Sequence, residues 1–449
     1  MSKSYHFIAV GGVGMSGLAK YLLQEGFKVS GSDISESKYT KQLVELGGKI
    51  YIGHNAENVP NDAVVVISSA IRESNVELMR ARELGLPVYH RSDLLAELSS
   101  RKPMFIGFSG THGKTTTSGM ASYLLSKAGL EPSFVVGGII PEYNTNAEFT
   151  NKDTFIAELD ESDGTIVKYH PQILVINNLE PDHLDFYKDG MVSLIKTFET
   201  AISHVKDNGK VLVNNDNEGV MQLKGNKKFI SYGLNNADYV AYNIVYNHGF
   251  TTFDVKYKDE FLCSIKIILP GVHNVYNALA VTASLKEAGY DVRDIVKHFE
   301  TFTGMGRRFQ KMAEIGSIDV YDDYAHHPTE IKSTLSAMKS FTHKKIVAVF
   351  QPHRYSRLQS LWNDFKTALT GVDRVIVTDV YAASEDKIDG INSKKFSEEL
   401  TGSEYISGSI EEVAKKLLPT LEENTVVIGL GAGTITNLAK ELKKANEEL

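Results

Sequence analysis

Short runs of β-branched and other apolar residues alternate along the chain with segments in which apolar residues recur every three or four positions. The first pattern is typical of buried strands and the second of amphipathic helices, so their alternation predicts parallel α/β architecture. In the first hundred residues we expect strands at 6–10, 28–32 and 63–68 and helices at 15–24, 41–46 and 76–84.

Changes in this pattern divide the chain. The polar segment 99–103 ends in proline and reads as a linker before a new strand at 104–108. Between 237 and 269 apolar and polar residues alternate, which indicates antiparallel strands. A further α/β unit follows Phe309. We therefore predict three α/β domains, the central one with an antiparallel insertion, at 1–102, 103–308 and 309–449.

Charge and cysteine content exclude several classes of protein. The 449 residues carry 48 Lys and Arg against 56 Asp and Glu, a formal net charge of −8. That balance argues against a protein that wraps nucleic acid or coats an anionic membrane surface. No run reaches the roughly 20 apolar residues of a membrane span. The single cysteine, Cys263, excludes an internal disulfide framework and a cysteine-based zinc site. We expect a cytoplasmic protein with no nucleic-acid or membrane partner.

One glycine-rich segment lies in the setting that a phosphate-binding loop requires. Ser109-Gly110-Thr111-His112-Gly113-Lys114-Thr115 stands between an expected strand and an expected helix. Glycines let backbone N–H groups turn toward a phosphate, and the helix N-terminus adds positive potential. Lys114 can reach the β- and γ-phosphates, and Thr115 can ligate Mg²⁺. Phe108 replaces the usual first glycine, so the match is to a shortened motif. The alternative is a tight turn with a surface lysine.

A second glycine-rich turn, Gly12-Val13-Gly14-Met15-Ser16-Gly17, follows the first expected strand. Asp33 ends the next strand at the spacing of a ribose-binding acid. Together they predict a site for a nucleotide or a nucleotide-sugar diphosphate, with a turn that binds no ligand as the alternative. For the third cluster, Gly429-Leu430-Gly431-Ala432-Gly433, we favour close packing in a turn.

Acidic residues gather at the carboxyl ends of two expected strands of the second domain. Glu158-Leu159-Asp160-Glu161-Ser162-Asp163 ends one strand, and Glu180-Pro181-Asp182-His183-Leu184-Asp185 follows the next. Strand ends of a parallel sheet meet at one edge, where carboxylates beside a phosphate loop would hold a hard cation. Glu161 and His183 are therefore candidate metal ligands. A solvated acidic loop and a structural histidine are the alternatives.

Polar groups also follow the first two expected strands of the third domain, in Asp322-Asp323-Tyr324-Ala325-His326-His327-Pro328 and Gln351-Pro352-His353-Arg354-Tyr355-Ser356-Arg357. Arg354 and Arg357 share a face if their segment is helical, and two guanidiniums suit a carboxylate ligand. A solvated basic face is the alternative.

Two further segments lie near the second domain boundary. Gly271-Val272-His273-Asn274-Val275-Tyr276-Asn277 opens a helix with polar groups, and its plain interpretation is capping, with Asn274 as the N-cap. Arg307-Arg308 is a basic pair whose plain interpretation is exposed surface charge.

These motifs together resemble the Mur ligases of peptidoglycan synthesis. The resemblance rests on the phosphate loop extended to Thr117, the segments at 160–163, 180–185 and 273–278, and Arg307-Arg308-Phe309, in family order across nearly the whole chain. Within the family, the segments 11–17, 323–330 and 351–357 resemble the branch that uses L-alanine. The resemblance implies an N-terminal Rossmann-like UDP-binding domain, a central P-loop ATPase-like domain and a C-terminal Rossmann-like amino-acid-binding domain.

The resemblance also implies roles for particular residues. The UDP-linked substrate would be held by Gly12, Gly14, Asp33, Ser69, His90 and Arg91. ATP would be held by Gly110, Thr111, His112, Gly113, Lys114, Thr115, Thr116, His273, Asn277 and Arg308. The metal ligands would be Thr115, Glu161 and His183. The amino acid would meet Tyr324, His326, His353, Arg354 and Arg357. The chemistry would depend on Lys114, Glu161, His183, His326 and His353.

The implied reaction joins L-alanine to the lactyl carboxylate of UDP-N-acetylmuramate through an acyl phosphate, with ATP and Mg²⁺ (or Mn²⁺). The implied enzyme is a monomer or homodimer. The nearest alternative is a recycling ligase that attaches a preformed peptide to the same sugar nucleotide. A nicotinamide oxidoreductase built on the first glycine turn and a non-catalytic nucleotide-binding regulator are further alternatives.

Two positions depart from the family pattern. Asn144 stands where glycine usually precedes the Thr-Asn-Ala at 145–147, and Thr434 stands where an acidic residue is more usual. Neither touches a proposed phosphate or metal ligand. Some relatives use a carbamylated lysine as a metal ligand, and we expect none here.

Overall fold

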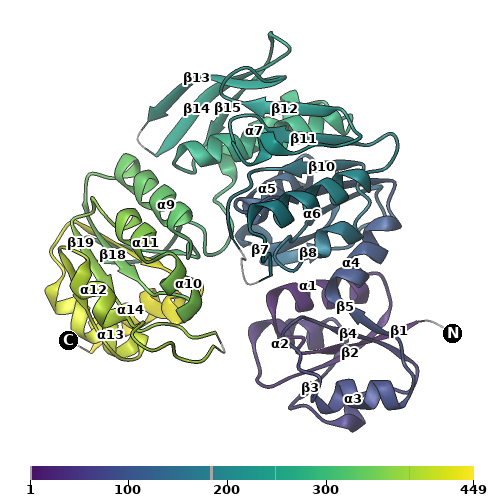
Figure 1. Cartoon of the computed structure of the whole chain (residues 1–449), viewed down its shortest axis with the longest axis horizontal. Helices are drawn as coiled ribbons and strands as arrows, with labels where there is room; N and C mark the ends of the chain where they lie inside the picture. Colours follow the sequence, from purple (N-terminus) through teal and green to yellow (C-terminus); the bar gives the residue numbers. More distant parts are fainter. Residues whose placement is uncertain (1–2, 183–185, 248, 384, 449) are drawn as a thin grey trace. The chain divides into compact units, whose positions relative to one another are not determined.

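The computed structural model describes residues 3–182, 186–247, 249–383 and 385–448, which form three β-sheets flanked by helices (Figure 1). These residues divide into two compact units. The first unit holds the chain up to Ile244, with Phe253–Lys266 and Tyr276–Phe302. The second unit holds Val245–Thr252, Ile267–Val275 and the described residues from Thr303 onward.

The N-terminal sheet is parallel throughout, in the order β3-β2-β1-β4-β5. β1 is the central strand: β2 and β3 lie on one side of it, and β4 and β5 lie on the other. The strand order therefore reverses at β1, and open α/β sheets bind ligands at the loops beside such a reversal. The strand ends two residues earlier than predicted, since Ala9 has a left-handed backbone with φ 61°. The elements are β1 (Ser4–Ile8), α1 (Val13–Gln24), β2 (Lys28–Asp33), α2 (Lys38–Glu45), β3 (Lys49–Ile52), β4 (Ala63–Ile67), α3 (Val76–Glu83), β5 (Val88–His90) and α4 (Arg91–Ser100).

The predicted linker at 99–103 is partly wrong, because Ser99 and Ser100 belong to the last turn of α4. Ser99 is buried and donates a hydrogen bond to the carbonyl of Ala96, so its polar side chain is satisfied within the helix. Polar composition alone therefore does not separate a linker from the end of a helix.

The central sheet has ten strands in the order β15-β14-β13-β12-β11-β10-β6-β9-β7-β8. β6 pairs in parallel with β10 and β9, which places the segment after β6 at the carboxyl edge of the sheet. Its elements are β6 (Met104–Ser109), α5 (Lys114–Lys127), β7 (Ser133–Ile140), β8 (Thr145–Glu148), β9 (Thr154–Glu158), β10 (Ile173–Ile176), α6 (Met191–Ser203), β11 (Lys210–Asn214), β12 (Phe229–Gly233), β13 (Tyr239–Asn247), β14 (Phe250–Tyr257), β15 (Glu260–Ile267), α7 (Val272–Glu287) and α8 (Val292–Ile295).

The predicted antiparallel insertion is the end of this sheet formed by β13, β14 and β15. Lys258 and Asp259 connect β14 to β15, and both have positive φ, 50° and 67°. A two-residue turn with positive φ at both positions matches the twist of an antiparallel hairpin. The alternating pattern of the sequence therefore identified these strands correctly.

The C-terminal sheet has six strands in the order β16-β17-β21-β18-β19-β20. β16 and β17 are antiparallel, and the remaining neighbouring strands are parallel. Apolar side chains of α9, α10, α11 and α12 cover one face, and those of α13 and α14 cover the other. The elements are β16 (Gln310–Ile315), β17 (Ile318–Asp323), α9 (Pro328–Phe341), β18 (Lys345–Phe350), α10 (Tyr355–Ser360), α11 (Trp362–Ala368), β19 (Arg374–Val377), α12 (Ser393–Glu399), β20 (Ser403–Tyr405), α13 (Ile410–Leu417), β21 (Thr425–Leu430) and α14 (Leu438–Glu447).

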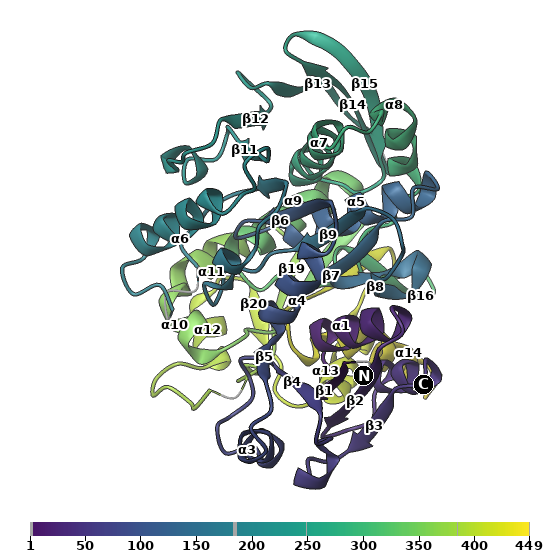
Figure 2. The same cartoon turned by 90° about the vertical axis from the view of Figure 1, so that its right-hand side faces the viewer.

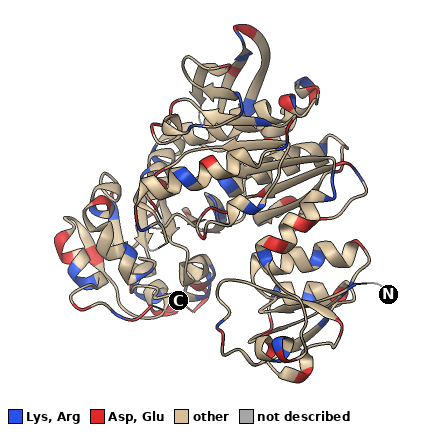
Figure 3. Ribbon diagram, turned by 45° about the vertical axis from the view of Figure 1, so that its right-hand side comes forward, with Lys and Arg blue, Asp and Glu red and all other residues tan. Residues whose placement is uncertain are grey.

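The three-domain α/β fold class predicted from the sequence is confirmed, with a mixed central sheet between two mainly parallel ones. Lysines and arginines are interspersed with aspartates and glutamates along the ribbon (Figure 3). In the described part of the chain, no helix is long and apolar enough to cross a membrane.

Candidate active site

The phosphate loop is the segment Ser109–Lys114, which joins β6 to α5 as the sequence predicts. Gly110 and Gly113 have positive φ, 125° and 83°. A Cβ atom at Gly110 would lie 2.8 Å from the carbonyl oxygen of Asn178, so backbone conformation and space both require glycine. The loop leads directly into the N-terminus of α5, where backbone N–H groups favour an anion.

Polar residues after β10 hold this loop in place. The backbone N–H of His112 donates to Oδ1 of Asn178 at 2.7 Å. The hydroxyl of Thr111 accepts a hydrogen bond from the backbone N–H of Glu180 at 2.9 Å. Thr116 follows on α5 and is nearly buried. The loop is therefore fixed by a neighbouring strand end rather than by its own glycines alone.

Lys114 lies between the phosphate loop and the acidic loop, which we define as Asp160–Asp163. Its Nζ is 2.9 Å and 3.0 Å from the two carboxylate oxygens of Glu161 and 2.7 Å from the carbonyl oxygen of Gly110. Burial lowers the pKa of Lys114, but the carboxylates of Glu161, Asp160 and Glu158 outweigh burial and raise that pKa above its ordinary value. Burial raises the pKa of the Glu161 carboxyl to about 7.

Oxygen ligands suitable for Mg²⁺ surround the start of α5. The hydroxyl of Thr115 donates to Oε2 of Glu158 at 2.8 Å, and the side chain of Glu161 is 1% exposed. A hydroxyl and several carboxylates form the hard donor set that Mg²⁺ prefers, so these residues fit the metal. The remaining predicted ligand, His183, lies outside the described residues.

The predicted UDP-binding residues lie at the carboxyl edge of the N-terminal sheet. Gly12 is the N-cap of α1, and Gly14 is in its first turn. The backbone N–H of Gly11 donates to Oδ2 of Asp33 at 2.8 Å, so the acid at the end of β2 is bound to the glycine turn. The hydroxyl of Ser69 lies 3.0 Å from Nε2 of His90. The structure thus places these residues around one edge.

Two of these residues contact the acidic loop of the central domain. Nη2 of Arg91 donates to Oδ2 of Asp160 at 2.9 Å, and the Ser69 hydroxyl donates to Oδ2 of Asp163 at 3.1 Å. Burial raises the pKa of Asp160, but the charges of Lys114 and Arg91 outweigh burial and lower that pKa to about 2. Asp160 is therefore a carboxylate held between two cations.

The segment that contains Asn144, one of the two departures from the family pattern, lies in the central domain and contacts the N-terminal domain. Asn144 adopts the left-handed conformation that glycine would favour, with φ 46° and ψ 39°. Two residues later, Nδ2 of Asn146 donates to the carbonyl oxygen of Val13 at 2.8 Å, and α1 lies beside β8 (Figure 2). A Cβ atom at Gly17 would lie 2.6 Å from Asn146, so the third glycine of the motif provides space for this contact.

His273 and Asn277 lie one turn apart on α7. Oδ1 of Asn277 would be 2.9 Å from a Cβ atom at Gly113, so Asn277 borders the phosphate loop. Burial, with the charge of Arg308, lowers the pKa of His273 to about 4. Because α7 begins at Val272, the interpretation of Asn274 as the N-cap is wrong; its side chain donates to the carbonyl of Pro270.

Arg308 is not an isolated surface charge. Its Nη1 donates to Oε1 of Glu330 at 3.3 Å, and its guanidinium lies 5.3 Å from the centre of the Tyr324 ring. The neighbouring Arg307 donates to the carbonyl of Gly431, and its Nε forms an ion pair with Oδ2 of Asp322 at 3.0 Å. The basic pair is thus built into the C-terminal domain.

The predicted amino-acid residues form one cluster in the C-terminal domain. The rings of Tyr324 and His326 are 5.3 Å apart, and those of His326 and His353 are 5.7 Å apart. Nη1 of Arg357 lies 3.3 Å from Nδ1 of His353. Burial lowers the pKa of His326 to about 4 and that of His353 to about 3, so both imidazoles are neutral at pH 7.

Arg354 differs from its predicted geometry. It precedes α10 and has φ 71° and ψ 138°, so it does not share a helical face with Arg357. A non-glycine residue in the left-handed region is strained and is often found at functional sites. The backbone N–H of Arg354 donates to the carbonyl of Tyr381 at 2.9 Å, which supports this conformation.

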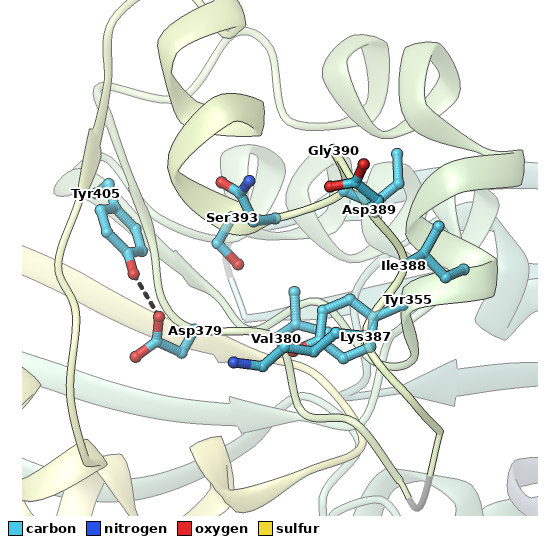
Figure 4. A pocket seen from close by; sticks show the side chains of 11 residues that line it. Tyr355, Asp379, Val380, Lys387, Ile388, Asp389, Gly390, Ser393 and Tyr405 are labelled. Atoms are coloured by element: carbon cyan, nitrogen blue, oxygen red, sulfur yellow. Dashed lines mark hydrogen bonds between the residues drawn. The ribbon is translucent and has the colours of Figure 1, made fainter.

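A separate hollow of about 770 Å³ lies farther along the carboxyl edge of the same sheet (Figure 4). The hydroxyl of Tyr405 donates to Asp379 at one side of it, and the side chain of Ser393 points into it. Tyr355, which follows Arg354, forms part of the wall, but none of the predicted amino-acid residues lines it.

Sequence reasoning did not single out Glu158, Asp160 or Asn178 as site residues, although the first two are within a quoted motif and Asn178 lies two residues before the next one. Glu158 holds the hydroxyl of Thr115, Asp160 pairs with Arg91, and Asn178 anchors the phosphate loop. Their position in the sequence could have indicated them. All three lie at or just after the carboxyl ends of β9 and β10, the strands that flank β6, where open α/β sheets place ligands.

The chain matches three family models in sequence order. The Mur ligase family, catalytic domain, matches residues 4–103; the Mur ligase middle domain matches 108–285; and the Mur ligase, glutamate ligase domain, matches 307–433. The chain therefore belongs to the Mur ligase family.

Among curated relatives, the chain is 41% identical to the UDP-N-acetylmuramate–L-alanine ligase of Aquifex aeolicus, over 99% of this chain and 98% of the relative. It is 42% identical to the enzyme of the same name from Hydrogenobaculum, over 98% of both chains. The crystal structure of the UDP-N-acetylmuramate-alanine ligase of Thermotoga maritima matches with a TM-score of 0.84 at 29% identity, over 99% of both chains. A murein peptide ligase from Psychrobacter arcticus shares the fold, with a TM-score of 0.74 at 21% identity over 100% of this chain and 99% of the other.

Proposed function

We propose that this protein joins L-alanine to the lactyl carboxylate of UDP-N-acetylmuramate, with hydrolysis of ATP to ADP and phosphate. The observation that carries the proposal is full-length identity of about 40% to ligases of that name, combined with a phosphate loop whose lysine contacts a buried carboxylate. The recycling reaction is less well supported, because the murein peptide ligase match supports the fold alone.

The first step activates the acid. A lactyl carboxylate oxygen attacks the γ-phosphorus of ATP, which gives an acyl phosphate and releases ADP. Carboxylate and triphosphate repel each other, so positive charge must lie between them. Lys114 supplies one such charge once it leaves Glu161 for the phosphates. Mg²⁺, held by Thr115, Glu161 and the predicted ligand His183, would neutralise further phosphate charge when bound.

The second step forms the amide. The alanine amine attacks the acyl carbon, and phosphate leaves with the oxygen that bridged carbon and phosphorus. Arg354 and Arg357 would bind the alanine carboxylate, so that the amine is oriented toward the acyl carbon. His326 and His353 are neutral at pH 7 and present imidazole nitrogens in the same cluster. Either can accept the proton that the attacking amine loses.

The acyl phosphate is tested by an isotope experiment. UDP-N-acetylmuramate labelled with ¹⁸O in its lactyl carboxylate is incubated with ATP, Mg²⁺ and L-alanine, and the released phosphate is analysed by mass spectrometry. The proposal predicts one ¹⁸O atom in the phosphate. Unlabelled phosphate would exclude activation of the carboxylate. A parallel reaction with a tripeptide in place of alanine should give no more than a small fraction of the product.

A further inference from the structure

The acidic loop Asp160–Asp163 is bound from two sides. On one side, Lys114 of the phosphate loop contacts Glu161 at 2.9 Å. On the other side, Arg91 of the N-terminal domain forms an ion pair with Asp160 at 2.9 Å. Four consecutive residues therefore connect the predicted nucleotide-phosphate site of one domain to the predicted UDP-diphosphate site of the other.

Arg91 also faces the glycine turn that begins α1. A Cβ atom at Gly14 would lie 3.7 Å from Nη1 of Arg91, while Nη2 contacts Asp160. The side chain of Arg91 is 35% exposed, so the ion pair with Asp160 does not seal it from solvent. Under the proposed function, the diphosphate of the UDP substrate occupies this turn, and a guanidinium there binds phosphate oxygens strongly.

We propose that Asp160 is a positioning residue that couples binding of the UDP-linked substrate to binding of the magnesium–nucleotide complex, through its ion pair with Arg91. This inference rests on the proposed function of the two sites. When a diphosphate takes over Arg91, Asp160 loses one of its two compensating charges, and the acidic loop becomes a better site for a divalent cation. When the cation binds the acidic loop first, Arg91 is released toward the diphosphate. The coupling is reciprocal by thermodynamic necessity.

The pair must be broken in a way that separates coupling from simple loss of structure. Asp160→Asn keeps the shape of the side chain but removes its charge. Because Arg91 is then no longer neutralised by a carboxylate, UDP-N-acetylmuramate should bind the nucleotide-free variant at least as tightly as it binds the wild type. A residue that only supported the fold would weaken this binding instead. Asp160→Glu, which restores the charge, should restore the coupling.

The test is isothermal titration of the full-length protein with UDP-N-acetylmuramate, in the absence and presence of Mg²⁺ and the β,γ-imido analogue of ATP. For the wild type, affinity should rise by about tenfold when the magnesium–nucleotide complex is present, within the range usual for coupled sites. For Asp160→Asn the ratio of the two affinities should be close to one.

A matched control is available between the same two domains. Lys168 forms an ion pair with Asp93 at 2.6 Å, and neither residue belongs to a phosphate loop or to the acidic loop. Lys168→Ala should keep the tenfold ratio. A wild-type ratio of one, or an unchanged ratio in Asp160→Asn, would overturn the inference while leaving the proposed function intact. Failure of the wild type to bind UDP-N-acetylmuramate under either condition would overturn both.

Discussion

Nζ of Lys114 lies 2.9 Å from Oε2 of Glu161, so the lysine of the phosphate loop is paired with a carboxylate that is 1% exposed. The same lysine also contacts two carbonyl oxygens of its own loop. In this arrangement, the lysine neutralises charge on the acidic loop. Phosphate groups of ATP would compete with Glu161 for the lysine, which would leave the carboxylate to a metal ion.

Lys114→Ala should reduce ADP release by about a hundredfold to a thousandfold, because removing one preorganised donor from a developing oxyanion typically costs that much. Binding of UDP-N-acetylmuramate should remain nearly unchanged, since the substituted side chain lies in the other domain. Steady-state ADP release and calorimetry measure the two effects. Lys127→Ala, at the exposed end of the same helix, is the control and should retain activity. Retained turnover in Lys114→Ala would remove the lysine from the mechanism.

Removal of divalent cation should abolish ADP release, because the acidic loop and Thr115 provide hard oxygen ligands. Thr115→Val deletes one such oxygen, and the Mg²⁺ concentration for half-maximal rate should rise at least about tenfold, the equivalent of one charge-assisted contact. The measurement is a Mg²⁺ titration of ADP release after dialysis against EDTA. An unchanged Mg²⁺ requirement in the variant would exclude Thr115 as a ligand.

Arg354→Ala should raise KM for L-alanine about tenfold to a hundredfold, since a hydrogen-bonded charge contact contributes about 1.5–3 kcal/mol. KM for ATP should change little. Arg374→Ala is a suitable control, because Arg374 pairs with Glu404 at the opposite end of its strand from the cluster. Equal increases in both KM values would argue that Arg354 supports the strained loop rather than the alanine carboxylate.

Protonation of His326 should destabilise the C-terminal domain in acid. Burial lowers the folded-state pKa of His326 to about 4, below the unfolded value of 6.5. Between these values the unfolded state binds more protons, so the free energy of unfolding falls as pH falls from 6.5 to 4, by up to about 3 kcal/mol. His326→Gln should reduce this dependence, while His353, whose pKa burial also lowers, keeps its own contribution.

The single tryptophan, Trp362, reports this domain directly. It lies on α11 against Phe396, so urea unfolding followed by its fluorescence measures the C-terminal domain. Identical pH dependence in the wild type and in His326→Gln would show that the imidazole is not protected from protonation in the folded state.

Much of the fold could be predicted from the chain, because periodicity is a local property. The alternation of apolar strands and helices gave the three α/β domains, and the alternating pattern before Leu269 gave the hairpin strands. In the N-terminal domain, the short strands β3 and β5 and the helix α4 were missed. β3 and β5 have no buried residue, and α4 mixes serines with apolar positions, so none of the three carries a strong pattern.

The sequence could predict the site residues that lie together in one short motif, but not the contacts between residues that are far apart in the chain. The phosphate loop has its shape from glycines whose φ is positive, and those glycines are visible in the sequence. The ion pair of Arg91 with Asp160 joins residues 69 positions apart, and the backbone of Arg354 is set by Tyr381 on a neighbouring loop. Such relationships depend on tertiary packing, which no local pattern contains.

The central claim is that one active site requires a nucleoside triphosphate, a UDP-linked acid and a small amino acid together. The most direct measurement combines ATP, Mg²⁺, UDP-N-acetylmuramate and L-alanine with the purified protein and detects products by mass spectrometry, with each substrate omitted in turn. The account predicts stoichiometric ADP and UDP-N-acetylmuramoyl-L-alanine in the complete mixture and no ligated product when any substrate is absent. A complete mixture that consumes no ATP and forms no ligated product would contradict it.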